Sequence, residues 1–331
     1  MSKRICLNCL KDVESLLTCT QCMTAHYCTR KCQLEHWKVH KNSCEDSSSD
    51  SKLEVLENKA YSYIHQGNYL KAAKLFEKLL LKLRSKDDGD NSDTLNIMNS
   101  LAGAHYNQGN FKEAERIYTE CLSKKRKLLG ETHFDVLLTM DGLANAYSRQ
   151  AKHKQAEVLF KISLNARKDT LGPEHPHTLE TMNSLASSYF GRGQYAEAEA
   201  LFEPCLDMMK VVLEDSPKTL NTMCNLSATY SKLGKYREAY ELFDECLDKQ
   251  KRVLGENHPD TLDTLQSLAG LHFADERYTD AENLFKQLLD KQTRVLGVNC
   301  QTTITTATCL AATYRKLGRP SEAEALKRSF R

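Results

Sequence analysis

Apolar side chains recur at helical spacing from about residue 53 to residue 331, and the pattern repeats about every 42 residues. In residues 178–193 they follow i, i+3, i+4 and i+7 spacing: Leu179, Met182, Leu185, Ala186 and Tyr189. Residues 194–213 form a second, longer helical segment. The pattern therefore predicts units of two helices, and about seven such units fit into this part of the chain.

Small and aromatic residues mark fixed positions in these units. An alanine opens each second helix: Ala72, Ala114, Ala156, Ala198, Ala239, Ala281 and Ala323. Another small residue lies in each first helix: Ala60, Ala102, Ala144, Ala186, Ser227, Ala269 and Ala311. An aromatic residue lies four positions after each of the first six alanines that open the second helices: Phe76, Tyr118, Phe160, Phe202, Phe243 and Phe285. Because one helix pair cannot bury its apolar stripe alone, stacked pairs sharing one core are expected, an all-α fold.

The ends of the predicted helices carry glycine and proline signals. A glycine that favours the left-handed conformation ends most first helices: Gly67, Gly109, Gly193, Gly234 and Gly318. Ala151 and Glu276 replace it in two units. The connector between units reads LGPEHPHT at 171–178 and LGENHPDT at 254–261. A shortened version, LEDSPKTL at 213–220, produces the single interval of 41 residues between Ala198 and Ala239.

This combination of columns and connector resembles the tetratricopeptide repeats (TPR) of the kinesin light chain class over residues 53–331. The resemblance implies a right-handed superhelical solenoid whose inner wall comes from the first helices. Two residues before the recurring leucine, the wall position holds Asn99, Asp141, Asn183, Cys224, Gln266 and Thr308. Asparagine amides there can bond the backbone of an extended peptide.

The resemblance further implies that Asn99 and Asn183 match the asparagines that hold short acidic peptides in kinesin light chains. Basic residues would have to assist, but those near the groove lie close to helix ends at inconsistent registers: Arg149, Arg192, Lys232, Arg315 and Lys316. For these cations a solvated surface is the alternative interpretation. The prediction is a groove for extended peptides, with an acidic ligand resting on the resemblance alone.

Eight candidate metal ligands occupy the first 44 residues: Cys6, Cys9, Cys19, Cys22, Cys28, Cys32, His40 and Cys44. Thiolate and imidazole are the usual zinc ligands, and this number suits two tetrahedral ions. A segment this short cannot bury enough apolar surface to fold alone, so zinc coordination would supply the missing free energy. The spacing leaves the pairing of ligands open, and it places His36 on the same helical face as Cys32 and His40. A disulfide framework is the alternative for the cysteines.

Residues 6–44 resemble a MYND-type zinc finger, with Tyr27 before Cys28 and Trp37-x2-His40-x3-Cys44. The resemblance implies two structural zinc ions in a cross-brace. One ion would be held by Cys6, Cys9, Cys28 and Cys32, and the other by Cys19, Cys22, His40 and Cys44. His26 and His36 then stay outside the ligand sets. Two closed tetrahedra leave no open position for catalysis. Gln33 and Trp37 match the residues that hold proline-rich peptides in similar fingers.

Composition narrows the function further. The 46 Lys and Arg nearly balance the 44 Asp and Glu, so a net charge of +2 gives no nucleic-acid or membrane signal. No apolar run is long enough to cross a bilayer, and the start lacks a secretory signal. Cysteines spaced as zinc ligands, together with single cysteines scattered along the repeats, are typical of proteins in a reducing compartment, the cytoplasm or the nucleus. Residues 45–52, rich in serine and acid, are expected to be a flexible linker between a finger at 1–44 and repeats at 53–331; Ser47–Ser49 are open to phosphorylation.

These features predict a non-enzymatic adaptor whose finger and repeat groove each bind short peptides of partner proteins. No residue order nominates an active site, a phosphate loop or a small-molecule substrate. A transcriptional or chromatin cofactor is the alternative. A MYND-associated methyltransferase is the enzymatic alternative, but the repeats leave no room for a SET domain. The finger's slight basic excess, seven Lys and Arg against three Asp and Glu, comes without a recognition-helix pattern for DNA.

Native mass spectrometry of the full chain should detect two zinc ions. Substituting Cys28→Ser should unfold the finger, because a structural zinc contributes on the order of 10–16 kcal/mol to such a fold. The far-ultraviolet helical signal of the repeats should stay almost unchanged. One zinc or none, or repeats that melt together with the finger, would contradict the two-domain interpretation.

Overall fold

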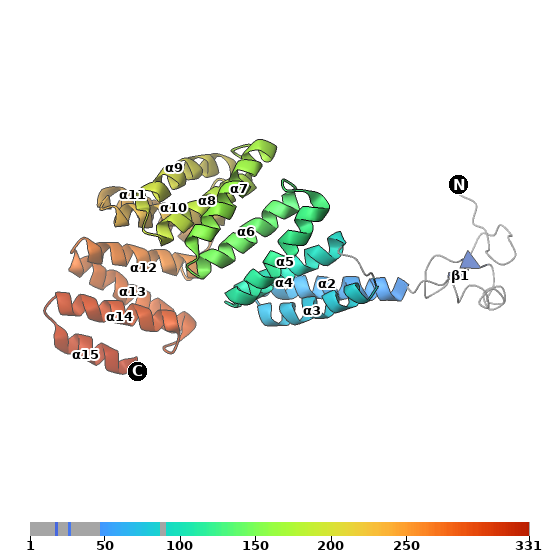
Figure 1. Cartoon of the computed structure of the whole chain (residues 1–331). Helices are drawn as coiled ribbons and strands as arrows, with labels where there is room; N and C mark the ends of the chain where they lie inside the picture. The colour runs from blue at the N-terminus through green and yellow to red at the C-terminus, as the bar shows by residue number, and fades with distance from the viewer. Residues whose placement is uncertain (1–16, 19–25, 28–46, 87–90, 331) are drawn as a thin grey trace. The chain divides into compact units, whose positions relative to one another are not determined.

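The computed structural model describes residues 17–18, 26–27, 47–86 and 91–330, coloured by position in Figure 1. The described residues form fourteen helices packed pairwise as tetratricopeptide repeats, which confirms the all-α prediction. The chain divides into two compact parts, called unit 1 (Met1–Lys124) and unit 2 (Lys125–Arg331), with the boundary inside helix α5 (Phe111–Leu129). None of the described helices has the length and apolar character needed to cross a membrane.

The helices alternate as first and second members of a pair. The first members are α2 (Ser47–His65), α4 (Ser92–Asn107), α6 (Phe134–Arg149), α8 (Pro176–Gly191), α10 (Pro217–Lys232), α12 (Pro259–Ala274) and α14 (Gln301–Lys316). The second members are α3 (Tyr69–Lys86), α5 (Phe111–Leu129), α7 (His153–Leu171), α9 (Tyr195–Val212), α11 (Tyr236–Val253), α13 (Tyr278–Leu296) and α15 (Pro320–Ser329). In the finger, β1 (Leu17–Thr18) pairs antiparallel with β2 (His26–Tyr27).

The predicted helix bounds agree with the observed ones within two residues for the unit used as the example. One difference concerns the expected linker, because α2 begins at Ser47 and so includes residues 47–52. Serine and aspartate favour the first turn of a helix, where carboxylates interact well with the exposed N–H groups. The acidic, serine-rich composition that suggested a linker is therefore also a composition that starts a helix.

The two small-residue columns lie at the centre of the packing. Every alanine of both columns has no exposed surface, and the aromatics of the third column are buried. In one cluster, Ala186 of α8 packs with Ala198 and Phe202 of α9 and with Leu220 and Met223 of α10. Burying each large apolar side chain contributes about 1.5–3 kcal/mol. Within residues 125–331, consecutive repeats therefore share core clusters, as the sequence pattern predicted.

The connector motif is explained by a local set of hydrogen bonds. Gly172 ends α7 with a φ of 95°, a value that favours glycine. His175 caps α8, its Nδ1 accepting the backbone N–H of His177 at 3.2 Å, and Pro176 is the first helical residue. Thr178 Oγ1 donates to the carbonyl oxygen of Gly172 at 2.8 Å, which closes the turn. The connector before α12 repeats this arrangement.

The positions that end the first helices adopt positive φ in every repeat, including the two that lack glycine. Gly193 and Gly234 have φ of 74° and 73°, and Ala151 and Glu276 have 59° and 58°. A side chain with a Cβ is strained in this conformation by roughly 1 kcal/mol. Ala151 and Glu276 therefore hold the same turn as their glycine counterparts at a cost in stability.

Substituting Ala151→Gly should raise the free energy of unfolding by about 0.5–1 kcal/mol, because glycine adopts this φ without strain. The matched control is Gly234→Ala, which should lower it by a similar amount, since open space surrounds that Cβ and only the backbone is affected. Urea unfolding followed by circular dichroism measures both. An unchanged or lower stability of Ala151→Gly would show that the strain is absent.

Candidate functional site

In unit 2, the side chain at the predicted inner-wall position forms a hydrogen bond with a side chain of the next repeat. Asp141 Oδ2 accepts from Thr181 Oγ1 at 2.9 Å, and Asn183 Oδ1 accepts from Thr222 Oγ1 at 3.1 Å. The same contact joins Cys224 to Thr264 at 2.9 Å and Gln266 to Thr306 at 3.2 Å. We call these eight residues the threonine ladder. The four threonines are buried, so each rung links two first helices away from bulk water.

The ladder changes the interpretation of the predicted peptide-binding asparagines. Asn183 is half-buried, and its carbonyl oxygen serves the rung to Thr222, which leaves the amide nitrogen as the group that can still bond a ligand. Asn99 is half-buried on α4 and has an interaction of its own. Peptide binding by these two residues stays a prediction. The sequence did contain a signal for the ladder, because a threonine recurs two residues before each wall position in this unit.

A second buried column, contributed by the second helices, supports the ladder from behind. Its members in unit 2 include Arg167, Met209, Gln250 and Gln292, all at most 2% exposed. Met209 Sδ lies 3.2 Å from Thr222 Oγ1, and Gln250 Nε2 lies 3.6 Å from Cys224 Sγ. The wall residues Asp141 and Cys224 are therefore held by their own repeat as well as by the next. Sequence patterning missed this column because arginine, methionine and glutamine share no hydropathy class.

The ladder residue Asp141 also forms an ion pair with Arg167, a buried side chain on the second helix α7. Arg167 Nη2 lies 2.9 Å from Asp141 Oδ2, Arg167 Nε donates to Ser163 Oγ at 3.3 Å, and the guanidinium lies 5.4 Å from the centroid of the Phe134 ring. Burial raises the pKa of Asp141, while the charge of Arg167 and hydroxyl hydrogen bonds act to lower it. The net upward direction indicates that desolvation outweighs the attraction. This pair therefore fixes the rung more than it stabilises the fold.

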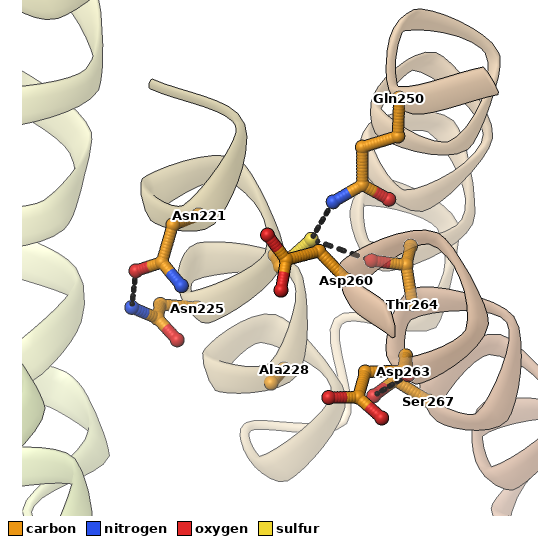
Figure 2. A pocket seen from close by; sticks show the side chains of 9 residues that line it. Asn221, Asn225, Ala228, Gln250, Asp260, Asp263, Thr264 and Ser267 are labelled. Atoms are coloured by element: carbon orange, nitrogen blue, oxygen red, sulfur yellow. Dashed lines mark hydrogen bonds between the residues drawn. The ribbon is translucent and has the colours of Figure 1, made fainter. Parts of the chain in front are cut away.

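A pocket of about 200 Å³ opens beside the ladder between α10 and α12. Its lining includes Asn221 and Asn225 from α10, Asp260 and Asp263 from α12, and the ladder residue Cys224. Figure 2 shows the two carboxylates directed toward the side where the asparagines lie. Burial and the neighbouring Asp260 raise the pKa of Asp263. The pocket offers amide donors and carboxylate acceptors, a suitable surface for peptide groups.

Several predicted cations near the groove are engaged with neighbours. Arg192 forms an ion pair with Glu157, and Arg315 pairs with Glu324 at 2.7 Å. Lys316 Nζ lies 6.0 Å from the centroid of the Tyr278 ring. These contacts support the interpretation of a solvated, paired surface rather than a row of anion-binding groups.

The finger residues predicted to act are outside the described residues. These are the eight zinc ligands together with Gln33 and Trp37. In the described part of the chain, no group of three or more His, Cys, Asp or Glu side chains is arranged to hold a metal ion. The predicted ligands of the two zinc ions all lie within residues 6–44, and the zinc site and its ligand assignment stay predictions from the spacing and the resemblance.

Comparison with known families finds two matches along the chain. The tetratricopeptide repeat family matches residues 51–127, 93–169, 135–210, 179–247, 215–290 and 264–329. The MYND finger family, a zinc-binding domain that typically holds two zinc ions, matches residues 6–44. The two families together cover both predicted domains.

Among individual proteins, the finger is similar to histone-lysine N-methyltransferases. Mouse Smyd1 is 50% identical over 40 residues, and human SMYD3 is 44% identical over 41 residues. These matches span 12% of this chain but only 8% and 10% of those enzymes, and they are confined to the finger.

Among solved structures, the repeats are similar to those of kinesin light chain-like proteins. A putative kinesin light chain of Podosopora anserina with nearly identical TPR-like repeats has a TM-score of 0.54 at 26% identity, covering 61% of this chain and 96% of that one. NprR in complex with its cognate peptide NprX has a TM-score of 0.58 at 14% identity, covering 84% of this chain and 77% of that one. The latter likeness shows the fold alone.

Substituting Arg167→Met should lower the free energy of unfolding by about 3–5 kcal/mol, because it leaves the Asp141 carboxylate buried without its cation. The double substitution Asp141→Asn with Arg167→Met copies the Asn183 and Met209 pair of the next repeat. It should return the stability to within about 1 kcal/mol of the original. Urea unfolding measures both variants, and a single variant as stable as the parent would contradict the role of the pair.

Proposed function

Because this chain belongs to the tetratricopeptide repeat family and carries a MYND finger, we propose that it is a non-enzymatic adaptor that binds two partner proteins. Both domains are protein-interaction modules. In our proposal the repeat groove binds an extended segment of one partner, and Gln33 and Trp37 of the finger bind a proline-rich segment of another. With two binding sites on one chain, partners that are themselves linked meet the second site at a raised effective concentration, so that two modest affinities combine.

The observation that carries this proposal is the exposed polar row beside the threonine ladder. Asn221 and Asp263 lie next to ladder threonines on consecutive first helices, both are exposed, and both line the pocket. Packed helices are about 8–10 Å apart, and an extended peptide advances about 3.3 Å per residue. A peptide crossing the first helices would therefore present about three residues to each repeat. The apolar columns set the spacing of these helices and the ladder links their wall residues, so the groove is formed before the peptide binds.

The charges in the pocket refine the chemistry of the ligand. Asp260 and Asp263 place two carboxylates beside the amides of Asn221 and Asn225. We propose that the segment bound here has a neutral or basic side chain, since an acidic one would meet like charges. The acidic peptides suggested by the family resemblance are not favoured at this position.

The enzymatic alternative has little support beyond the finger. The methyltransferase similarity is restricted to about 40 residues, and repeats follow the finger. We therefore favour an adaptor, with a transcriptional or chromatin cofactor as the second candidate because histone-lysine methyltransferases carry similar fingers. We propose a cytoplasmic or nuclear location on the cysteine usage.

A peptide-display selection on the full chain tests both surfaces at once. Asn221→Ala with Asp263→Ala should weaken peptides bound in the groove by about tenfold or more, since each hydrogen bond lost contributes about 1 kcal/mol. It should leave proline-rich peptides unaffected. Gln33→Ala with Trp37→Ala should weaken the proline-rich peptides and leave the groove peptides unaffected. Val211→Ala, at an exposed position on α9, serves as the control.

Each outcome bears on a separate part of the proposal. Groove peptides that bind the pocket variant as well as the parent would exclude this pocket as the site. Proline-rich peptides that ignore the finger variant would exclude Gln33 and Trp37. Failure to select any peptide, with zinc and helical content intact, would contradict the adaptor function.

A further inference from the structure

Two cysteine side chains meet at the inner side of the α10–α12 pocket. Cys224 of α10 and Cys246 of α11 have their sulfur atoms 3.0 Å apart. A disulfide has a sulfur–sulfur distance of about 2.05 Å, so a shift of about 1 Å would bring them to bonding distance. Cys224 lines the pocket, whereas Cys246 has no exposed surface. A small solute in the pocket can thus reach the Cys224 thiol, and the Cys246 thiol lies directly behind it.

This pairing arises because two repeat columns hold cysteine in the same repeat. Cys205 occupies the α9 position that corresponds to Cys246, and the two thiols donate to equivalent backbone carbonyl oxygens, Leu179 and Leu220, each at 3.3 Å. The wall residue of the Cys205 repeat is Asn183, so Cys205 has no thiol partner there. The chain therefore contains its own matched control: the same buried thiol with and without a facing cysteine.

The surroundings of Cys224 distinguish its chemistry from that of Cys246. Cys224 Sγ lies 2.9 Å from Thr264 Oγ1 and 3.6 Å from Gln250 Nε2, in addition to the Cys246 thiol. These hydrogen bonds lower the pKa of Cys224, with the Cys246 thiol contributing most. The contact with Cys224, together with burial, raises the pKa of Cys246. Because Cys224 lines the pocket and Cys246 has no exposed surface, Cys224 is the attacking thiol and Cys246 the resolving one.

We propose that Cys224 and Cys246 form a peroxide-sensitive dithiol that closes to a disulfide between α10 and α11. The Cys224 thiolate attacks one oxygen of hydrogen peroxide, the O–O bond breaks, and the released hydroxide takes up a proton to become water. The sulfenic acid on Cys224 is then attacked by the Cys246 sulfur. The S–S bond forms, the S–O bond breaks, and a second water leaves with the Cys246 proton. The two sulfurs supply the two electrons that reduce the peroxide.

Closing this disulfide would act on the threonine ladder. Cys224 Sγ also forms the rung to Thr264, which links α10 to α12. Movement of the sulfur toward Cys246 in α11 breaks that rung beside the pocket. Oxidation would therefore loosen the contact between two consecutive repeats at the place where Asn221 and Asp263 lie. The disulfide itself forms whether or not the groove binds a peptide.

The test uses the reduced, zinc-bound full chain treated with hydrogen peroxide, then alkylated, digested with trypsin and analysed by mass spectrometry. We expect peptides 219–232 and 238–249, which contain Cys224 and Cys246, to become cross-linked and to separate again with dithiothreitol. Peptides 117–124 and 193–210, which contain Cys121 and Cys205, should be recovered with alkylated thiols and without a cross-link. Separate peptides report the finger thiols, so their oxidation does not obscure the result.

Two variants at equivalent positions complete the test. Cys246→Ser should remove the cross-link and leave a sulfenic acid on Cys224 that dimedone traps. Cys205→Ser replaces the equivalent buried thiol and should leave the cross-link yield unchanged. The proposal is overturned if peroxide oxidises Cys205 as fast as Cys224, or if Cys224 is oxidised in the parent chain without linking to Cys246.

Discussion

The close approach of helices at the alanine columns is the constraint on which the repeats depend. Ala186 and Ala198 have no exposed surface, and Phe202 fills the space beside them. Any larger side chain at these alanines would separate the helices and remove the contacts of the neighbouring aromatic. Because each cluster draws residues from adjacent repeats, the packing of one repeat fixes the position of the next. The polar features of unit 2 are built on that spacing.

The threonine ladder shows how such a core can contain polar groups without losing order. A rung such as Asn183 to Thr222 satisfies two groups that would otherwise be buried without partners. The wall residue of a rung varies, from the carboxylate of Asp141 to the thiol of Cys224, while each bonds the threonine of the next repeat. Variation is tolerated because the backbone spacing is set by the apolar columns. A cysteine is therefore accommodated in one rung, where it faces a second cysteine.

The site could be predicted from sequence only in part. Helical spacing predicts one inner-wall position on each first helix, and the residues at that position, Asn183 and Cys224 among them, each bond a threonine of the next repeat. This contact was not predicted, because the threonine comes from the next repeat, about 40 residues away in the chain. Cys246, on the second helix of the Cys224 repeat, is buried. Its closeness to Cys224 depends on how two helices cross, which periodicity does not specify.

The sequence by itself determined the repeat length, the two-helix unit, the buried columns and the MYND-type finger at residues 6–44. These properties follow from local spacing, which fixes side-chain direction on a helix and ligand type in a metal site. Only the tertiary structure decided which polar groups meet between helices. Asp141 with Arg167, Asn183 with Thr222 and Cys224 with Cys246 are such pairs. Their partners are set by the packing distance and angle of neighbouring helices, which arise from the whole core rather than from any single segment.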